Sequence, residues 1–163
     1  MNLTYPGPVI LGLPQFNIDL PEDWRLTDDP DLLMVAGTSE PHNGFRNNVT
    51  INGGRAPRPI EPVQIAERSR ESGIDGADSV DFSPPTARDG LLPGLAMEVA
   101  ISVNGMELSQ VQHVLVAEPP EDRGVAFWYQ LTGTCRADDT AGRADNDDAI
   151  TGRQARTTPG LVG

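Results

Sequence analysis

Hydrophobic and polar residues alternate most regularly between Leu95 and Val103, where every second residue is large and apolar. This is the period of a half-buried β-strand. Asn104-Gly105 follows at once, and because both residues adopt positive φ at low cost, the pair predicts a two-residue type I′ turn. Two more apolar runs follow, Met106–Val116 and Gly124–Thr134. The pattern therefore predicts a three-stranded antiparallel meander as the core of the fold.

Shorter apolar runs before the meander predict further strands at residues 15–20, 32–36, 45–51 and 79–83. Asn52-Gly53-Gly54 is expected to end the strand at 45–51. The proline-rich stretch 55–62 is expected to lie outside the sheet, since proline cannot donate to the interior of a ladder. Trp24 follows the first predicted strand and is expected to close one end of the core.

Residues 62–72 are predicted to form a helix. Pro62 suits the first helical position, Glu61 complements the N-terminal dipole, and Gly73 suits the position after the last turn. The apolar face, made of Val63, Ile65 and Ala66, is narrow. A helix this short is marginal alone, so it is expected to pack on the sheet.

The composition changes after Cys135. Residues 136–163 are rich in Asp, Arg and Gly, and their large apolar residues are Ile150, Leu161 and Val162. Such a segment buries too little surface to offset its ordering entropy, so it is predicted to be a mobile tail, with a weak helix around 138–154 as the alternative. The predicted organisation is an irregular lead-in at 1–13, one domain at 14–135 and an acidic tail at 136–163.

The charge balance narrows the range of partners. The formal net charge is −12, and all twelve basic residues are arginine. A surface of this sign repels phosphate backbones, so no nucleic-acid partner is expected. Residues 1–13 lack the features of a signal peptide, and no apolar run approaches membrane-spanning length. A cytoplasmic location is therefore expected.

Candidate chemistry is sparse. Cys135 has no second cysteine to pair with, and His42 and His113 show no ligand spacing of the usual kind. The chain carries no Gly-x-Ser-x-Gly elbow, no phosphate-binding glycine loop and no calcium loop with its glycine and glutamate in place. We therefore expect no metal, no cofactor and no catalytic residue, and we interpret the chain as a protein that is not an enzyme.

A series of landmarks resembles the actinobacterial LpqN/LpqT-like family. Residues 16–24 are similar to its opening strand and Leu-Pro-x-x-Trp turn, and residues 44–51 to its Gly-Phe-x-x-Asn-Val strand. The Asn104-Gly105 hairpin and the stretches 110–114 and 129–134 continue the same order. The resemblance implies the PsbP-like fold, an α+β sandwich in which helix packs on one face of an antiparallel sheet. Two departures are the missing lipobox and the acidic tail in place of the family's closing helix.

The resemblance also implies a class of function. Proteins with this fold are mostly non-enzymatic, and they include lipoproteins, photosystem accessory subunits, Ran-binding factors and chaperones. The expected function is a protein-binding accessory or adaptor, such as a chaperone or accessory factor of a secretion or cell-envelope system. The alternative is a small-molecule or lipid carrier that uses a pocket between sheet and helix.

The strand at 125–134 supplies the candidate binding residues. Phe127, Tyr129 and Leu131 share one face and are predicted to lie in the core. Trp128 and Gln130 point to the other face, where Trp128 is either covered by the helix or exposed as an anchor for another protein. Because Trp often dominates interface energetics, Trp128 and Gln130 are the predicted partner-binding residues.

Overall fold

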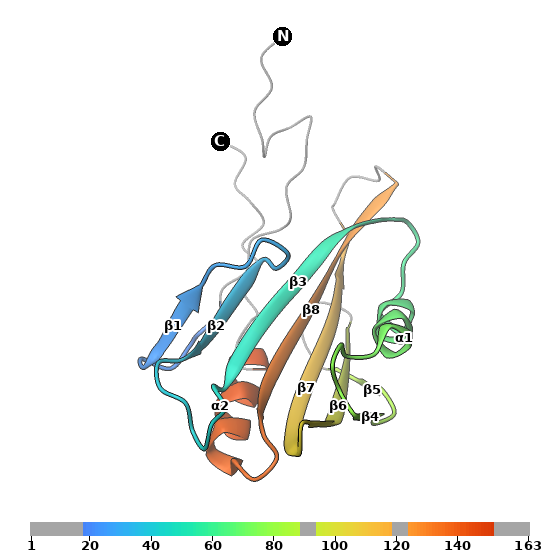
Figure 1. Ribbon diagram of the computed structural model, residues 1–163. Helices are drawn as coiled ribbons and strands as arrows, with labels where there is room; N and C mark the ends of the chain where they lie inside the picture. Colours follow the sequence, from blue (N-terminus) through green and yellow to red (C-terminus); the bar gives the residue numbers. More distant parts are fainter. Residues whose placement is uncertain (1–17, 89–93, 119–123, 152–163) are drawn as a thin grey trace.

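The computed structural model describes residues 18–88, 94–118 and 124–151, which form one antiparallel sheet and two helices (Figure 1). The sheet has 8 strands in the order β1-β2-β3-β8-β7-β6-β4, with β5 paired to β6. The elements are β1 Trp24–Thr27, β2 Met34–Thr38, β3 Asn48–Pro57, α1 Pro62–Ser72, β4 Ser79–Phe82, β5 Thr86–Ala87, β6 Gly94–Val103, β7 Met106–Ala117, β8 Val125–Arg136 and α2 Thr140–Thr151. The predicted α+β class is confirmed.

The meander of β6, β7 and β8 lies where the alternating pattern placed it. Asn104 and Gly105 have φ values of 50° and 76°, as a type I′ turn requires. The turn pairs Val103 with Met106, and the ladder continues to pair residues of β6 and β7 down to Gly94 and Leu115. Because side chains alternate along each strand, this register puts the apolar positions of β6 on one side of the sheet.

The strand β3 corrects one sequence prediction. Asn52-Gly53-Gly54 was expected to end a strand, but β3 runs on to Pro57 and pairs with β8 over its whole length. A Cβ on Gly53 would lie 3.0 Å from Cδ1 of Tyr129, and one on Gly54 would lie 3.3 Å from Nε1 of Trp128. The two glycines thus leave room for the aromatic rings of β8, which is one of the uses of glycine within a strand.

The start of the described chain also differs from the prediction. Of the strand expected at 15–20, residues 18–20 are described and form no strand. The first strand instead begins at Trp24, whose side chain is 6% exposed and packs with the core that includes Ala36 and Ile150. The predicted role of Trp24 in the core is therefore confirmed, although its local structure was predicted as a turn.

The two helices lie on opposite faces of the sheet, whereas the sequence predicted helix on one face. Helix α1 has its predicted bounds, and its start is fixed by the Glu61 amide, which donates to Oε1 of Gln64 at 2.8 Å. It packs over β6 and β7, and its buried residues Ile65 and Ala66 meet Met97 and other apolar side chains. Helix α2 packs over β8, β7 and β3 at the lower end of the sheet in Figure 1.

The prediction of a mobile tail was wrong for residues 136–151. Strand β8 extends through Arg136, and α2 follows with Ala149 and Ile150 1% and 0% exposed. Residues 152–163, like the lead-in at 1–13, lie outside the described residues. The helix packs stably on the sheet with few apolar residues because it approaches the sheet closely. A Cβ on Gly133 of β8 would lie 2.8 Å from Cβ of Asn146 and from Cδ1 of Ile150.

Polar contacts anchor the start of α2. Oδ1 of Asp139 accepts a hydrogen bond from the Gly142 amide at 2.9 Å, in the manner of an N-cap. Oδ2 of the same carboxylate accepts from Nδ2 of Asn47 at 2.7 Å. These two hydrogen bonds hold the pKa of Asp139 below its ordinary value. A side chain at Gly142 would collide with the Asn47 amide, so this glycine also serves close approach.

The first prediction concerns the β6–β7 turn. Gly105→Val places a β-branched residue at positive φ and is expected to lower the free energy of unfolding by more than about 1 kcal/mol. The cost comes from the backbone, since a Cβ at this position would meet no atom within 4 Å. Urea denaturation measures the loss, and Asn104→Gly is the control, expected to change stability by less than about 0.5 kcal/mol. Equal stability of Gly105→Val and Asn104→Gly would contradict the positive φ that the turn assigns to Gly105.

The second prediction concerns α2. Ile150→Ala removes a fully buried side chain and is expected to lower the free energy of unfolding by about 2–5 kcal/mol. The exposed Asp148 of the same helix provides the control, since Asp148→Ala should stay within about 0.5 kcal/mol of the parent. If Ile150→Ala proves as mild as its control in urea denaturation, residues 140–151 do not pack as described.

Candidate functional site

One side of the sheet carries the candidate site, and we call its uncovered part the polar face. The face lies on the same side as α1, which packs mainly over β6 and β7 and meets β8 through the contact of Ser69 with Gln130. The register of β1, β2, β3 and β8 places ten side chains or glycines on it. They are Arg25, Thr27, Val35, Gly37, Asn48, Thr50, Asn52, Gln130, Thr132 and Thr134, of which Thr134 is buried and the others are exposed or half-buried. None of the ten is acidic, although the chain carries 24 acidic residues.

A hydrogen-bonded network joins the polar face to α1. Nε2 of Gln130 donates to Oγ of Ser69 on the helix at 3.1 Å and to Oε1 of Gln112 at 3.3 Å. Nε2 of Gln112 in turn donates to Oε1 of Gln110 at 3.0 Å. Gln112 is 3% exposed, so the network satisfies amides that would otherwise be costly to bury. The network fixes the position of α1 over the sheet.

The two residues predicted to bind a partner lie side by side on this side of the sheet. Trp128 is half-buried and packs against the core under α1, close to Gly54. Gln130 is half-buried and belongs to the network with Ser69. Both therefore lie at the border between α1 and the polar face, and their role in binding stays a prediction. Phe127, Tyr129 and Leu131 are buried on the opposite side, as the sequence predicted.

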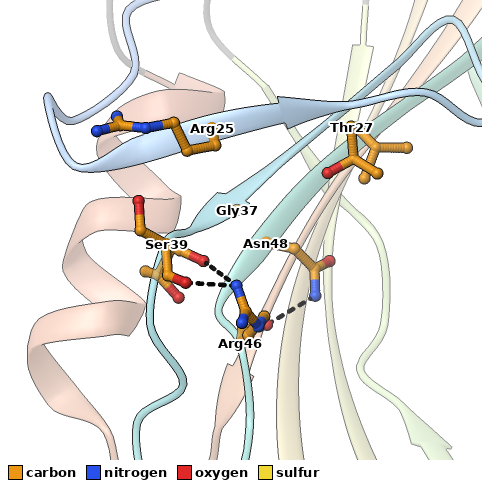
Figure 2. A pocket seen from close by; sticks show the side chains of 8 residues that line it. Arg25, Thr27, Gly37, Ser39, Arg46 and Asn48 are labelled. Atoms are coloured by element: carbon orange, nitrogen blue, oxygen red, sulfur yellow. Dashed lines mark hydrogen bonds between the residues drawn. The ribbon is translucent and has the colours of Figure 1, made fainter.

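At the far end of the polar face the surface is hollowed. The hollow has a volume of about 560 Å³ and is open to solvent. It is lined by Arg25, Thr27, Val35, Gly37, Thr38, Ser39, Arg46 and Asn48. In Figure 2, Arg25 and Arg46 lie on opposite sides of Gly37 and Ser39. Two cationic side chains thus frame a hollow in a strongly acidic chain.

Gly37 makes the hollow. It lies between Arg25 of β1 and Asn48 of β3 in the ladder, so the missing side chain leaves the floor open. A Cβ at Gly37 would lie 2.8 Å from the carbonyl oxygen of Asn47, which leaves no room for a larger residue. The backbone packing of β2 on β3 therefore keeps the hollow empty of the protein's own side chains.

Backbone carbonyls hold both arginines in place. Nη1 of Arg25 donates to the carbonyl oxygens of Glu22 and Trp24, each at 2.9 Å. Nη1 of Arg46 donates to the carbonyl oxygens of Ser39 and, at 3.4 Å, of Thr38. Within the described residues neither guanidinium forms an ion pair, and no other nitrogen of either one has a partner. Each retains hydrogen-bond donors for an external group.

The sequence did not single out these arginines. Arg25 comes directly after the turn that the sequence predicted to end at Trp24, and Arg46 lies in the strand predicted at 45–51. Their proximity comes from the antiparallel pairing of β1 with β2 and of β2 with β3. The spacing could have indicated a polar face of the sheet, because polar residues alternate with apolar ones on these short strands. The polar residues are Arg25, Thr27, Asn48, Thr50 and Asn52.

The opposite side of the sheet buries polar groups of a different kind. His113 is 3% exposed, and burial together with the charge of Arg88 lowers its pKa from 6.5 to about 4. Asn146 of α2 is 1% exposed, and among the described residues neither its Oδ1 nor its Nδ2 has a hydrogen-bond partner. Both side chains lie on the side of the sheet that α2 covers.

The remaining candidates for reactive chemistry do not come together. Cys135 is 1% exposed near the end of β8, and burial raises the pKa of its thiol, which disfavours the reactive thiolate. His42 lies in the exposed turn before β3, where it pairs with Phe45, and is remote in sequence from buried His113. In the described part of the chain no three His, Cys, Asp or Glu side chains gather as a metal site would require. The described helices are also too short or too polar to cross a membrane.

No family model and no curated protein matches the sequence. Among solved structures, the chain is similar to LpqN of Mycobacterium tuberculosis, described as involved in cell envelope biogenesis. The TM-score is 0.70 and the sequence identity 18%, and the match covers 93% of this chain and 86% of LpqN. The chain shares the fold of LpqN. At this identity the likeness concerns the fold alone, and it agrees with the fold that the sequence landmarks implied.

A third prediction separates the two roles of Trp128. Trp128→Ala is expected to lower the free energy of unfolding by about 2 kcal/mol, because the half-buried ring loses its contacts with Gly54 and the core under α1. If Trp128 also anchors a partner, the yield of a pull-down falls even at a temperature at which the variant is fully folded. Thermal unfolding and pull-down yield, measured side by side, distinguish these outcomes. Unchanged yield would remove Trp128 from the binding site.

A fourth prediction concerns acid sensitivity. Because the pKa of His113 is lower in the folded chain than the ordinary 6.5, the unfolded chain binds its proton first as the pH falls. The contribution of neutral His113 to the free energy of unfolding is therefore fully present above pH 6.5, and it is lost as the pH falls toward 4. Between pH 7.5 and pH 5 the loss should amount to about 2 kcal/mol.

Urea denaturation at the two pH values measures this loss. His113→Leu should remove most of it, whereas His42→Leu should leave it unchanged, since His42 is exposed. The lowered pKa of Asp139 acts in the same direction but only near and below its ordinary value, so it adds little above pH 5. A wild-type chain with equal stability at both pH values would show that His113 is not buried in its neutral form.

Proposed function

We propose that the chain is a non-enzymatic accessory or adaptor protein that binds another protein through its polar face. The observation that carries this proposal is the face itself, an accessible side of the sheet with Asn, Gln, Thr and Arg side chains and no carboxylate. Such a surface offers many hydrogen-bond donors and acceptors on rigid strands. In protein interfaces, polar surfaces of this kind form hydrogen bonds to the partner around a few anchoring residues.

The carrier alternative required a pocket between the sheet and α1. The described residues there are packed side chains, with Ile65 and Ala66 of the helix against Met97, Val114 and other buried residues. Beside them the Ser69–Gln112–Gln130 network fills the polar end of the contact. This packing favours partner binding over a carrier role, since a drug-sized ligand needs a cavity of several hundred Å³ that buries most of its surface.

The setting of this function is also part of the proposal. The likeness to LpqN, which is described as involved in cell envelope biogenesis, supports an accessory role in an envelope or secretion system and a distant relationship to the LpqN/LpqT-like family. A cytoplasmic location, expected from the sequence, is proposed together with a protein rather than a nucleic acid as partner. Cell fractionation with an antibody to the chain tests the location.

The fifth prediction tests the binding surface. Asn52 and Arg55 are both exposed on β3 and lie on opposite sides of the sheet. Asn52→Tyr places a bulky ring on the polar face, and Arg55→Tyr places the same ring on the other side. A tagged chain is used to capture proteins from its native lysate, with quantitative mass spectrometry as the measurement.

Proteins that dock on the polar face should be lost from the Asn52→Tyr sample by tenfold or more, about 1.4 kcal/mol in affinity, and retained by Arg55→Tyr. Circular dichroism confirms that both variants are folded. Equal capture by both variants would place any partner elsewhere. A wild-type chain that retains no protein above an untagged control would contradict the adaptor function.

A further inference from the structure

We propose that the hollow between Arg25 and Arg46 binds a carboxylate side chain of an acidic segment in the partner protein. This inference rests on the proposed function and names the chemistry of the partner. It comes from three observations on the described residues: the open floor at Gly37, the two arginines held by backbone carbonyls, and the absence of acidic side chains from the polar face.

The arginines are arranged to accept an anion. Each uses Nη1 to bond to backbone carbonyl oxygens, which orients the guanidinium group and leaves its other nitrogens as donors. A guanidinium group offers paired, parallel N–H donors that match the two oxygens of a carboxylate. Because the orientation is set before binding, less side-chain entropy is lost when the anion arrives.

The chain's own carboxylates do not occupy this position. Glu22 and Asp23 are the nearest acidic residues to Arg25 in the sequence, and they contact the site through backbone carbonyls. Those carbonyls accept from Arg25 and from Oγ of Ser39, the latter at 2.6 Å. Neither carboxylate pairs with Arg25 or Arg46 within the described structure. Elsewhere in it arginines do find carboxylates, as Arg143 does at 2.7 Å from Glu98.

Charge determines the class of anion. With a net charge of −12, the chain repels long polyanions such as nucleic acids, and the local attraction of two arginines cannot offset that over an extended backbone. A short acidic segment presents its carboxylate within a few ångströms of the arginines, where attraction dominates. The hollow of about 560 Å³ also fits a few side chains rather than a single small ion.

A displayed library of random twelve-residue peptides tests the inference. The library is selected on the immobilised full chain and, in parallel, on the double variant Arg25→Gln/Arg46→Gln. Arg68→Gln is the matched control, because Arg68 is exposed on α1 and distant in sequence from the hollow. Asp and Glu should be enriched in peptides selected by the wild type and by the control, but not by the double variant. Equal enrichment on all three, or none, overturns the inference.

A double-mutant cycle then establishes the contact. The strongest selected peptide is labelled, its affinity is measured by fluorescence anisotropy, and its Glu or Asp residues are replaced singly by Gln or Asn. Removing the recognised carboxylate or the two arginines should each weaken binding about tenfold, and removing both should cost little more than either alone. If the losses of affinity from the peptide and the protein substitutions are additive, the arginines do not contact the carboxylate and affect binding only through the structure of the chain. Arg46→Lys keeps the charge without the paired donors and should retain part of the affinity.

The outcomes separate this inference from the proposed function. Peptides that require the polar face, as judged by loss with Asn52→Tyr, but carry no excess of acidic residues would leave the adaptor function standing and refute the carboxylate site. Competition by millimolar inorganic phosphate with no preference for acidic peptides would show a phosphate site instead, and would refute it too. Lysate capture that fails for every variant contradicts the adaptor function itself.

Discussion

The architecture depends on how closely α2 approaches β8. The helix has few large apolar residues, and its contact with the sheet forms because Gly133 on the strand and Gly142 on the helix carry no side chain. Close approach brings Ile150 and Asn146 into full burial and lets the Asp139 carboxylate bridge the helix start and Asn47. Dispersion contacts depend steeply on distance, so small residues can supply packing that composition alone does not suggest.

Covering one face this way leaves the two sides of the sheet with different chemistry. The α2 side holds a closed apolar core that includes Val49, Ile51, Tyr129 and Leu131. On the other side, α1 lies mainly over β6 and β7 and reaches β8 at Trp128 and Gln130, and the strands beyond it carry mostly polar residues. Polar side chains on exposed strands need no partner within the protein, because water or another molecule can satisfy them. The division between the core and the polar face therefore follows the strands that each helix covers.

The sequence predicted the fold where the signal was local. The alternation in 95–103, the Asn104-Gly105 turn and the proline at the start of α1 each act over a few residues, and the structure confirms all three. The prediction failed where a neighbour remote in sequence decides the outcome. Gly53-Gly54 has the local sequence of a strand end, but the two glycines continue the strand and make room for the rings of Tyr129 and Trp128. The acidic segment has the composition of a mobile tail, but Gly133 allows its helix to pack on the sheet.

The candidate site was predictable only in part, for the same reason. Trp128 and Gln130 were assigned to the correct side of the sheet because the period of two is local. The arginine hollow needed the pairing of β1, β2 and β3, which brings Arg25 and Arg46, 21 residues apart in the sequence, to the lining of one hollow. A charge pattern summed along the chain hides such a site, because the total of −12 is dominated by residues elsewhere.

The makeup of the polar face also determines how it responds to its surroundings. Arginine, amide and hydroxyl side chains keep their charge state across the whole physiological range. The acidic remainder of the surface does not, since its carboxylates become neutral as the medium acidifies. The charge of the polar face therefore stays constant with pH, while the charge of the surrounding surface changes. In neutral solution the face, which has no carboxylate among its ten residues, contrasts with the charge of −12 carried by the whole chain, and in acid that contrast fades without any change in the face itself.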